Sequence, residues 1–201
     1  MKDLVVVVAD HNTEQAISAL LQRNKALQIR AIDFDIFVHP ERNPGVLQRG
    51  VALLNQIDAL QKYHYALLMF DREGCGKETL ASSNLEQLVQ GDLDANGWQG
   101  RSAVVVIDPE LEAWVFSNSP HVVEVFADGD EELFRRILNS FPQTPLGKPQ
   151  RPKEAVEKLL RQKAIVRSSA LYGELASKVS LKGCADPAFQ KFCAFLQGWF
   201  P

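Results

Sequence analysis

Cysteine is scarce in this chain of 201 residues, which holds only Cys75, Cys184 and Cys193. Because they are odd in number and widely spaced, they predict neither a disulfide framework nor a metal site of Cys-x-x-Cys spacing. Long apolar runs are absent too, since none approaches the roughly 18 to 20 residues of a membrane span. The first apolar run, residues 4–9, is too short and too close to the start for a signal peptide. We therefore expect a cytoplasmic protein without a membrane partner.

Two nucleotide-binding motifs are also missing. The chain has no Gly-x-Gly-x-x-Gly turn and no Gly-x-x-x-x-Gly-Lys-[Ser/Thr] loop. These absences disfavour a classical dinucleotide site and exclude a P-loop.

The charge balance is uneven along the chain. Hydrophobic residues make up 46% and charged residues 23%, as in ordinary globular domains. Residues 1–147 carry 12 Lys and Arg against 21 Asp and Glu, whereas residues 148–201 carry 10 against 4. The net charge of −3 excludes a uniformly basic nucleic-acid coat protein but leaves room for a local basic surface.

Apolar runs and helical spacings alternate over the first 129 residues. The runs predict strands at 4–9, 29–38, 65–70 and 103–107, and the spacings between and after them predict helices at 14–27, 46–60, 78–89 and 109–116. Thr13 is the expected N-cap of the first helix, and residues 91–100 are expected to form a polar loop. The second run alternates in polarity, which favours a position near the sheet edge. The pattern predicts a doubly wound α/β fold with a mainly parallel four-stranded sheet.

The remaining residues, 130–201, show only helical spacing. Short helices are expected at 131–138, 153–162, 168–177 and 186–197, with a proline-rich connection at 142–152. We expect this helical C-terminal extension to pack on the core formed by residues 1–129 as a single compact unit.

Carboxylates follow three of the four predicted strands. The first strand leads into Asp10 and Glu14 and the third into Asp71 and Glu73, while the fourth is followed by Asp108, Glu110 and Glu112. In open α/β sheets, ligands bind outside the carboxyl ends of the strands. Oxygen ligands suit Mg²⁺ or Mn²⁺, although an Asp at a strand end is also an ordinary helix N-cap.

Two of these segments have informative spacing. Asp71 and Glu73 stand two apart beside Gly74 and Gly76, which permit a bend that lets both reach one ion; a plain turn with solvated charges is the alternative. A helix that begins near Pro109 would place Asp108 and Glu112 on one face. Acidic residues in that first turn would also complement the helix dipole without any further role.

Basic and histidine residues near these ends are candidates for contacts with a phosphate. Arg72 and Lys77 flank the glycine turn, His11 follows the first strand, and Arg151 and Lys153 begin the basic segment of the extension. Such side chains position a nucleic-acid backbone. The alternative is a solvated helical face, or pairing with the acidic core.

Short motifs carry a resemblance to a known family. Asp10-His-Asn-Thr-Glu14, Asp71-Arg-Glu73 and Pro109-Glu-Leu-Glu-Ala-Trp114 stand in order, followed by Pro152-Lys153, Tyr172 and Asp186-Pro-Ala-Phe189. Together they resemble a bacterial family of uncharacterised proteins with a Toprim-like core, found near restriction and phage-defence genes. The resemblance covers residues 4–197.

The resemblance implies Mg²⁺-dependent chemistry on nucleic acid, with a catalytic Glu after the first strand and an Asp-x-Asp pair after the third. Asp71 and Glu73 match that pair, with Glu in the second place. Relatives have Glu-Gly where this chain has Ala9-Asp10. Asp10 is then the nearest acidic candidate, and Glu14 matches the Glu of a Thr-Glu pair.

We therefore expect a nuclease-like phosphoryl-transfer enzyme that uses Mg²⁺ or Mn²⁺. Its catalytic residues would be Asp10, Glu14, Asp71 and Glu73, its metal ligands Asp71, Glu73, Asp10 and Glu112, and its substrate contacts Arg72, His11, Lys77, Arg151 and Lys153. The alternative is a non-catalytic Toprim-like interaction module with a protein partner in a defence or restriction complex, which the missing first glutamate favours. A small-molecule phosphohydrolase or nucleotide-binding domain is the third reading.

Overall fold

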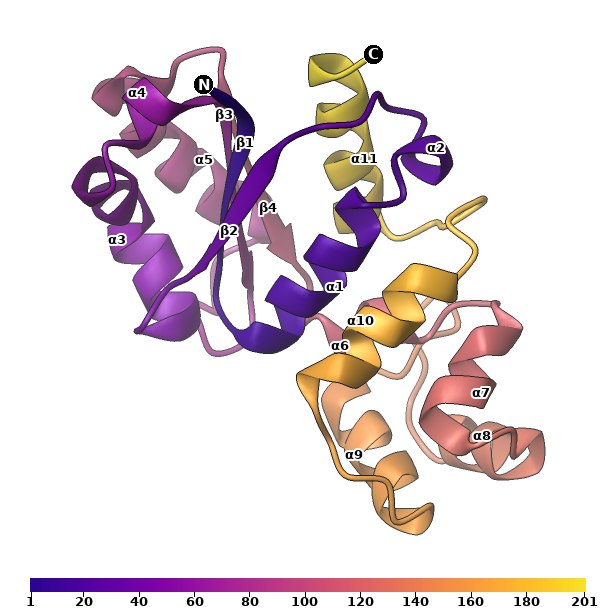
Figure 1. The fold of residues 1–201 in the computed structure, drawn as a ribbon. Coiled ribbons are helices and arrows are strands. Elements are labelled where there is room, and N and C mark those ends of the chain that lie inside the picture. The colour runs from indigo at the N-terminus through magenta and orange to yellow at the C-terminus, as the bar shows by residue number, and fades with distance from the viewer.

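The computed structural model describes all 201 residues around a parallel sheet of four strands (Figure 1). The strands are β1 (Lys2–Val8), β2 (Phe34–Val38), β3 (Tyr63–Asp71) and β4 (Ser102–Ile107), in the spatial order β2-β1-β3-β4. All three pairings are parallel. The predicted doubly wound α/β fold is confirmed, and so is the edge position of the second strand.

Helices cover both faces of the sheet, because successive side chains of a strand point to opposite faces. Val6 and Val8 of β1 belong to one buried cluster, whereas Val5 and Val7 belong to the other. The first face is covered by α1 (His11–Leu21) and α11 (Pro187–Trp199), the second by α3 (Arg42–Gln56) and α5 (Ser82–Leu93). Three shorter elements connect them: α2 (Asn24–Leu27), α4 (Ala59–Lys62) and the π-helical turn η1 (Asp94–Trp98).

Five helices form a lobe beside the carboxyl ends of the strands (Figure 1). They are α6 (Glu112–Val115), α7 (Pro120–Ala127), α8 (Glu131–Asn139), α9 (Pro152–Gln162) and α10 (Ser169–Lys178). The chain then returns to the sheet as α11, so strands and extension share one cluster of 35 buried residues. None of the helices has the length and apolar character needed to cross a membrane.

Two helix starts differ from the sequence-based expectation. α1 begins at His11 because Asp10, not Thr13, is its N-cap: the Asp10 carboxylate accepts the Thr13 N–H at 2.9 Å. After β4, the helix begins at Glu112 and not near Pro109. The intervening backbone instead bonds to the segment just after β3, since the Pro109 carbonyl accepts the Glu73 N–H at 2.9 Å.

Two further corrections concern the segments around β4. The expected helix 78–89 lies later, as α5, and residues 91–100 are not a polar loop because η1 buries Trp98 completely. The helix α7 was not expected at all. Its first residue is Pro120, which is compatible with a first helical turn.

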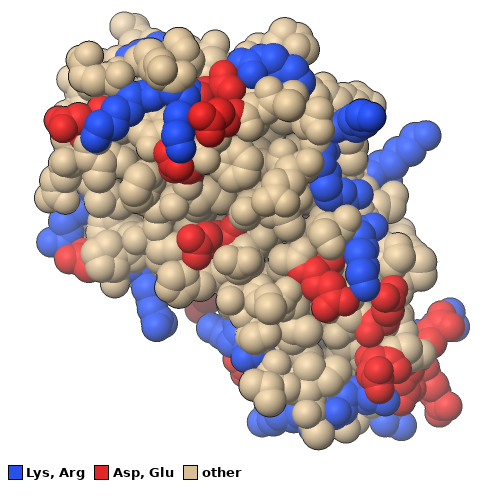
Figure 2. Space-filling model, in the orientation of Figure 1, with Lys and Arg blue, Asp and Glu red and all other residues tan.

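The charge asymmetry of the sequence does not become two separate charged faces. Figure 2 shows both signs interspersed over the sheet region and the helical lobe on the face drawn. Several basic residues of the extension instead pair with acids of the first 147 residues, as in Arg167–Glu112 at 2.6 Å and Lys178–Glu124 at 2.9 Å. Intramolecular pairing therefore accounts for part of the basic segment.

Candidate carboxylate site at the ends of β1, β3 and β4

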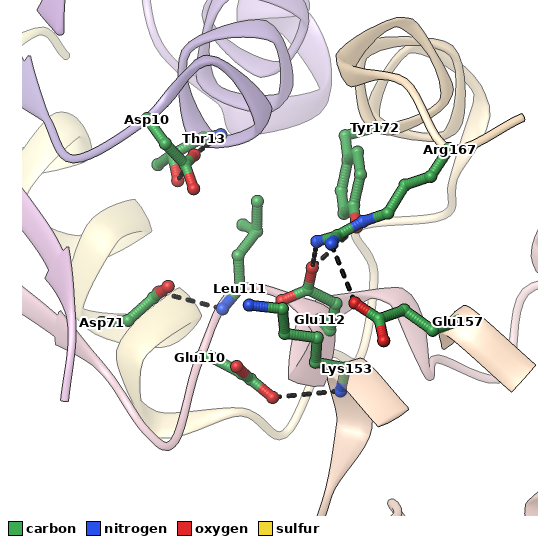
Figure 3. Close-up of polar contacts among 10 residues, drawn as sticks. All are labelled: Asp10, Thr13, Asp71, Glu110, Leu111, Glu112, Lys153, Glu157, Arg167 and Tyr172. Carbon is green, nitrogen blue, oxygen red and sulfur yellow. Dashed lines mark hydrogen bonds and ion pairs between the residues drawn. The ribbon is translucent and has the colours of Figure 1, made fainter. Parts of the chain in front are cut away.

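The strand order reverses direction between β1 and β3, so the segments after these strands diverge to opposite faces of the sheet. Such a switch point is where open α/β sheets bind ligands. Asp10 follows β1, Asp71 ends β3, and the segment after β4 carries Glu110 and Glu112; Figure 3 shows these side chains around a common space. Lys153 enters the same space from α9.

Asp71 is the buried member of this group, with only 9% of its surface exposed. Its Oδ1 accepts the Leu111 N–H at 2.9 Å, and its own N–H donates to Asn43 Oδ1 at 3.0 Å. Burial raises the pKa of Asp71 well above its usual range, and the charges of Glu112, Asp10 and Glu110 raise it further, while the Leu111 N–H opposes them. Its other oxygen, Oδ2, accepts no hydrogen bond from the protein.

The two carboxylate oxygens of Asp10 have different surroundings. Its Oδ1 accepts the Thr13 N–H at 2.9 Å and the Thr13 hydroxyl at 3.0 Å, which holds the side chain at the start of α1. Oδ2 has no donor in the protein. Asp10 therefore offers one oxygen to a ligand while the other caps a helix.

Glu112 is buried at 3% exposure but not alone, because two donors from the extension reach it. Its Oε1 accepts Arg167 Nη2 and the Tyr172 hydroxyl, each at 2.6 Å. Arg167 also donates to Glu157 at 3.0 Å. Burial and the neighbouring Glu112 carboxylate raise the pKa of Tyr172, so the phenol stays a hydrogen-bond donor at neutral pH.

Glu110 and Lys153 connect the site to α9. Glu110 Oε1 accepts the backbone N–H of Lys153 at 3.0 Å, so this carboxylate caps the first turn of the helix. Burial and the charge of Glu112 raise the pKa of Glu110, and the Lys153 N–H opposes them. The Lys153 side chain extends between Asp71 and Glu112 in Figure 3, yet its ammonium forms no ion pair.

A polar cleft of about 360 Å³ adjoins this space and has no hydrophobic lining. Two predicted substrate contacts, Arg151 and Lys153, line this cleft together with Glu73 and Glu110. Arg151 is exposed and pairs with Glu154 at 3.5 Å. The remaining lining residues are Pro109, Gln150 and Glu154.

Other predicted site residues lie in different surroundings. Glu73 is exposed whereas Asp71 is buried, so the structure does not hold this pair in one environment. His11 is exposed and pairs with Glu14 at 2.7 Å. Arg72 is bound to Asp108 at 2.9 Å, and Lys77 is exposed without an ion pair.

Asn43 is a site residue that sequence reasoning missed. Its amide accepts the Asp71 N–H and donates to the Glu73 carbonyl at 3.2 Å, which fixes the exit of β3. Arg167 and Tyr172 were not predicted as partners of Glu112 either. No local signal marks Asn43 or Arg167, and Tyr172 stood out only as part of the family resemblance. Each of the three contacts a site segment from a distant part of the chain.

We call Asp10, Asp71, Glu110 and Glu112 the carboxylate centre. Its donor chemistry fits a hard divalent cation. All its candidate ligand atoms are carboxylate oxygens, and Asp71 and Asp10 each keep one oxygen free of protein donors. No three His, Cys, Asp or Glu side chains converge on one metal position in this structure. Mg²⁺ needs only one or two carboxylates, since it retains several waters and binds substrate phosphates.

No protein-family model, curated protein or solved structure matches this chain. The Toprim-like resemblance therefore stays a prediction, and functional roles rest on the arrangement of the residues themselves.

Proposed function

We propose that the chain is a Mg²⁺- or Mn²⁺-dependent phosphodiesterase of Toprim-like type that acts on nucleic acid. The observation that carries the proposal is the environment of Asp71, a buried carboxylate surrounded by three others and not paired with a cation. Like charges gathered in a poorly solvated place cost free energy. A divalent cation would offset that cost.

Asp71 and Asp10 are the residues that would hold the cation. When bound, it would neutralise charge on a phosphate and lower the pKa of a water molecule. Of the other predicted ligands, Glu112 already satisfies Arg167 and Tyr172, and Glu73 lies in the adjoining cleft. In this proposal, Glu112 and Glu73 therefore lie near the cation and do not hold it.

The basic side chains of the extension would bind the substrate. Lys153 points into the carboxylate centre without an ion pair, so its ammonium is free to donate to a phosphate oxygen. Glu110 positions it by capping the helix that carries it. Arg151, at the outer cleft, would contact a neighbouring phosphate of the same strand, which favours a polymeric substrate.

A cleavage assay with the full chain tests this function. Single-stranded DNA, duplex DNA, RNA and p-nitrophenyl phosphate would each be incubated with Mg²⁺, Mn²⁺ or EDTA. We expect cleavage of a nucleic acid only with the divalent cations and a loss of about 100-fold or more in Asp71→Asn. The matched control is Asp92→Asn, an exposed carboxylate of α5 in no ion pair. Equal cleavage by Asp71→Asn and wild type would overturn the assignment.

The second candidate is a non-catalytic module of a defence or restriction complex. It is favoured by the absence of a converged three-ligand group and by the capping role of Asp10. Calorimetry distinguishes the two, since a non-catalytic module would bind neither Mg²⁺ nor Mn²⁺ at the carboxylate centre and would cleave none of the substrates.

A further inference from the structure

A second cavity lies at the other end of α1, away from the carboxylates. Its volume is about 620 Å³, within the range of small-molecule sites. It is bounded by Arg23 just after α1, by α2, by the segment that joins α10 to α11, and by α11 itself.

The charged side chains of this cavity are both cationic. They are Arg23 and Lys182, and no Asp or Glu contributes to the lining. Neither residue forms an ion pair. Figure 2 agrees, because the flank around α2 shows Lys and Arg side chains with no acidic side chain among them.

Arg23 is half-buried and fixed in place by two backbone acceptors. Its Nη1 donates to the carbonyls of Ala176 and Val179, at 2.7 and 2.8 Å, which satisfies the C-terminal end of α10. That capping role accounts for Nη1 alone, since Nε and Nη2 donate to nothing in the protein. Burial lowers the pKa of Arg23 and no carboxylate opposes this effect.

The rest of the lining is preformed and amphipathic. Leu27, Leu181 and Phe189 supply an apolar wall. The amide groups of Gln190 and Gln197 donate to the Cys184 and Leu27 carbonyls, at 3.2 and 2.9 Å, which fixes both side chains. Their Oε1 atoms remain as acceptors for N–H groups of a ligand.

We propose that this cavity binds a nucleoside monophosphate, with the phosphate at Arg23 and Lys182 and the base against the apolar wall. Two unpaired cations match a phosphate dianion, and a guanidinium fork suits its oxygens. The apolar wall and the amide acceptors match a flat ring that carries N–H donors. The site is separate from the carboxylate centre and does not depend on the phosphodiesterase function.

Titration of the full chain with AMP, followed by calorimetry, tests the site. We expect saturable one-to-one binding that weakens about tenfold in Lys182→Gln, which removes one charged donor from an exposed side chain. Arg23→Gln should weaken it at least as much. The matched control is Lys25→Gln, because Lys25 is exposed on α2 but does not line the cavity.

Three further measurements test the ligand preference, the position and the independence of this site. Adenosine and inorganic phosphate should each bind more weakly than AMP, and AMP should slow maleimide labelling of Cys184, which lines the cavity, while buried Cys75 stays unlabelled. Asp71→Asn should bind AMP like wild type, which separates this site from the carboxylate centre. No saturable AMP binding, or wild-type affinity for AMP in both Lys182→Gln and Arg23→Gln, would refute the site.

Discussion

The two ends of α1 carry opposite chemistry. At its N-terminal end, Asp10 and Asp71 form an acidic, partly buried centre, whereas beyond its C-terminal end Arg23 and Lys182 line a wide cavity without acids. The helical extension supplies a cation to each, through Lys153 at the first and Lys182 at the second. The difference teaches that the basic extension acts at individual contacts, not as one charged face.

The largest expected effect is that a substitution in either region impairs only the property of that region, either cleavage or AMP binding. Asp71→Asn should reduce cation-dependent cleavage about 100-fold or more and leave AMP affinity unchanged. Lys182→Gln should weaken AMP binding about tenfold and leave the cleavage rate unchanged. Cleavage rates and calorimetry on both variants check this. If either variant impaired both properties, the two regions would not be independent sites.

Lys153→Gln tests the acidic centre at the N-terminal end of α1. We expect a tenfold to 100-fold loss of cleavage, on the order of one charge-assisted hydrogen bond to phosphate. The melting temperature should stay near the wild-type value, because Glu110 accepts the backbone N–H of residue 153, which the substitution keeps. Steady-state rates and thermal melts give both readouts, with Lys25→Gln as control. An unchanged rate would remove Lys153 from the site.

Tyr172→Phe tests how the extension holds the acidic centre. The variant removes one of the two donors to Glu112 and leaves Arg167 in place. We expect the free energy of unfolding to fall by roughly 1.5 to 3 kcal/mol, the contribution of one hydrogen bond to a charged group, because Glu112 keeps its bond from Arg167. Urea unfolding measures it. A loss no larger than that of an exposed substitution would show that the Glu112 contact contributes little.

The pH dependence of stability is the smallest expected effect. Because the pKa of Asp71 is raised on folding, the folded chain binds more protons than the unfolded chain above the ordinary pKa of Asp, about 3.9. The contribution of Asp71 to stability therefore falls as the pH rises through this window. Asp71→Asn should remove that part of the slope and stabilise the protein at neutral pH by roughly 0.5 to 2 kcal/mol. Unfolding curves between pH 4.5 and pH 8 measure the difference; a parallel slope in both proteins would contradict it.

The sheet was predictable because its strands are apolar on both faces. Residues 4–8 and 103–107 are buried by helices on each side, which produces continuous Val-rich runs, while β2 at the edge alternates in polarity. The helix starts were harder. Asp10 and Thr13 are both good N-caps, and only the backbone conformation of Asp10 decides between them.

The strand-end rule led from sequence to Asp10, Asp71, Glu110 and Glu112, which the structure places around one space. It could not separate Asp71 from Glu73, because spacing does not tell which side chain is buried. The partners of the carboxylates lie far along the chain: Arg167 is 55 residues from Glu112, and Asn43 is 28 residues from Asp71. Contacts of that kind follow from the packing of helices against strand ends, which no local pattern encodes.

The most direct test of the central claim is Mn²⁺ binding to the full chain, measured by calorimetry in the wild type, Asp71→Asn and Asp92→Asn. A cation site at the carboxylate centre predicts that the wild type and Asp92→Asn bind Mn²⁺ alike, and that Asp71→Asn binds at least about tenfold more weakly. Equal binding by all three proteins, or none by the wild type, would contradict the account.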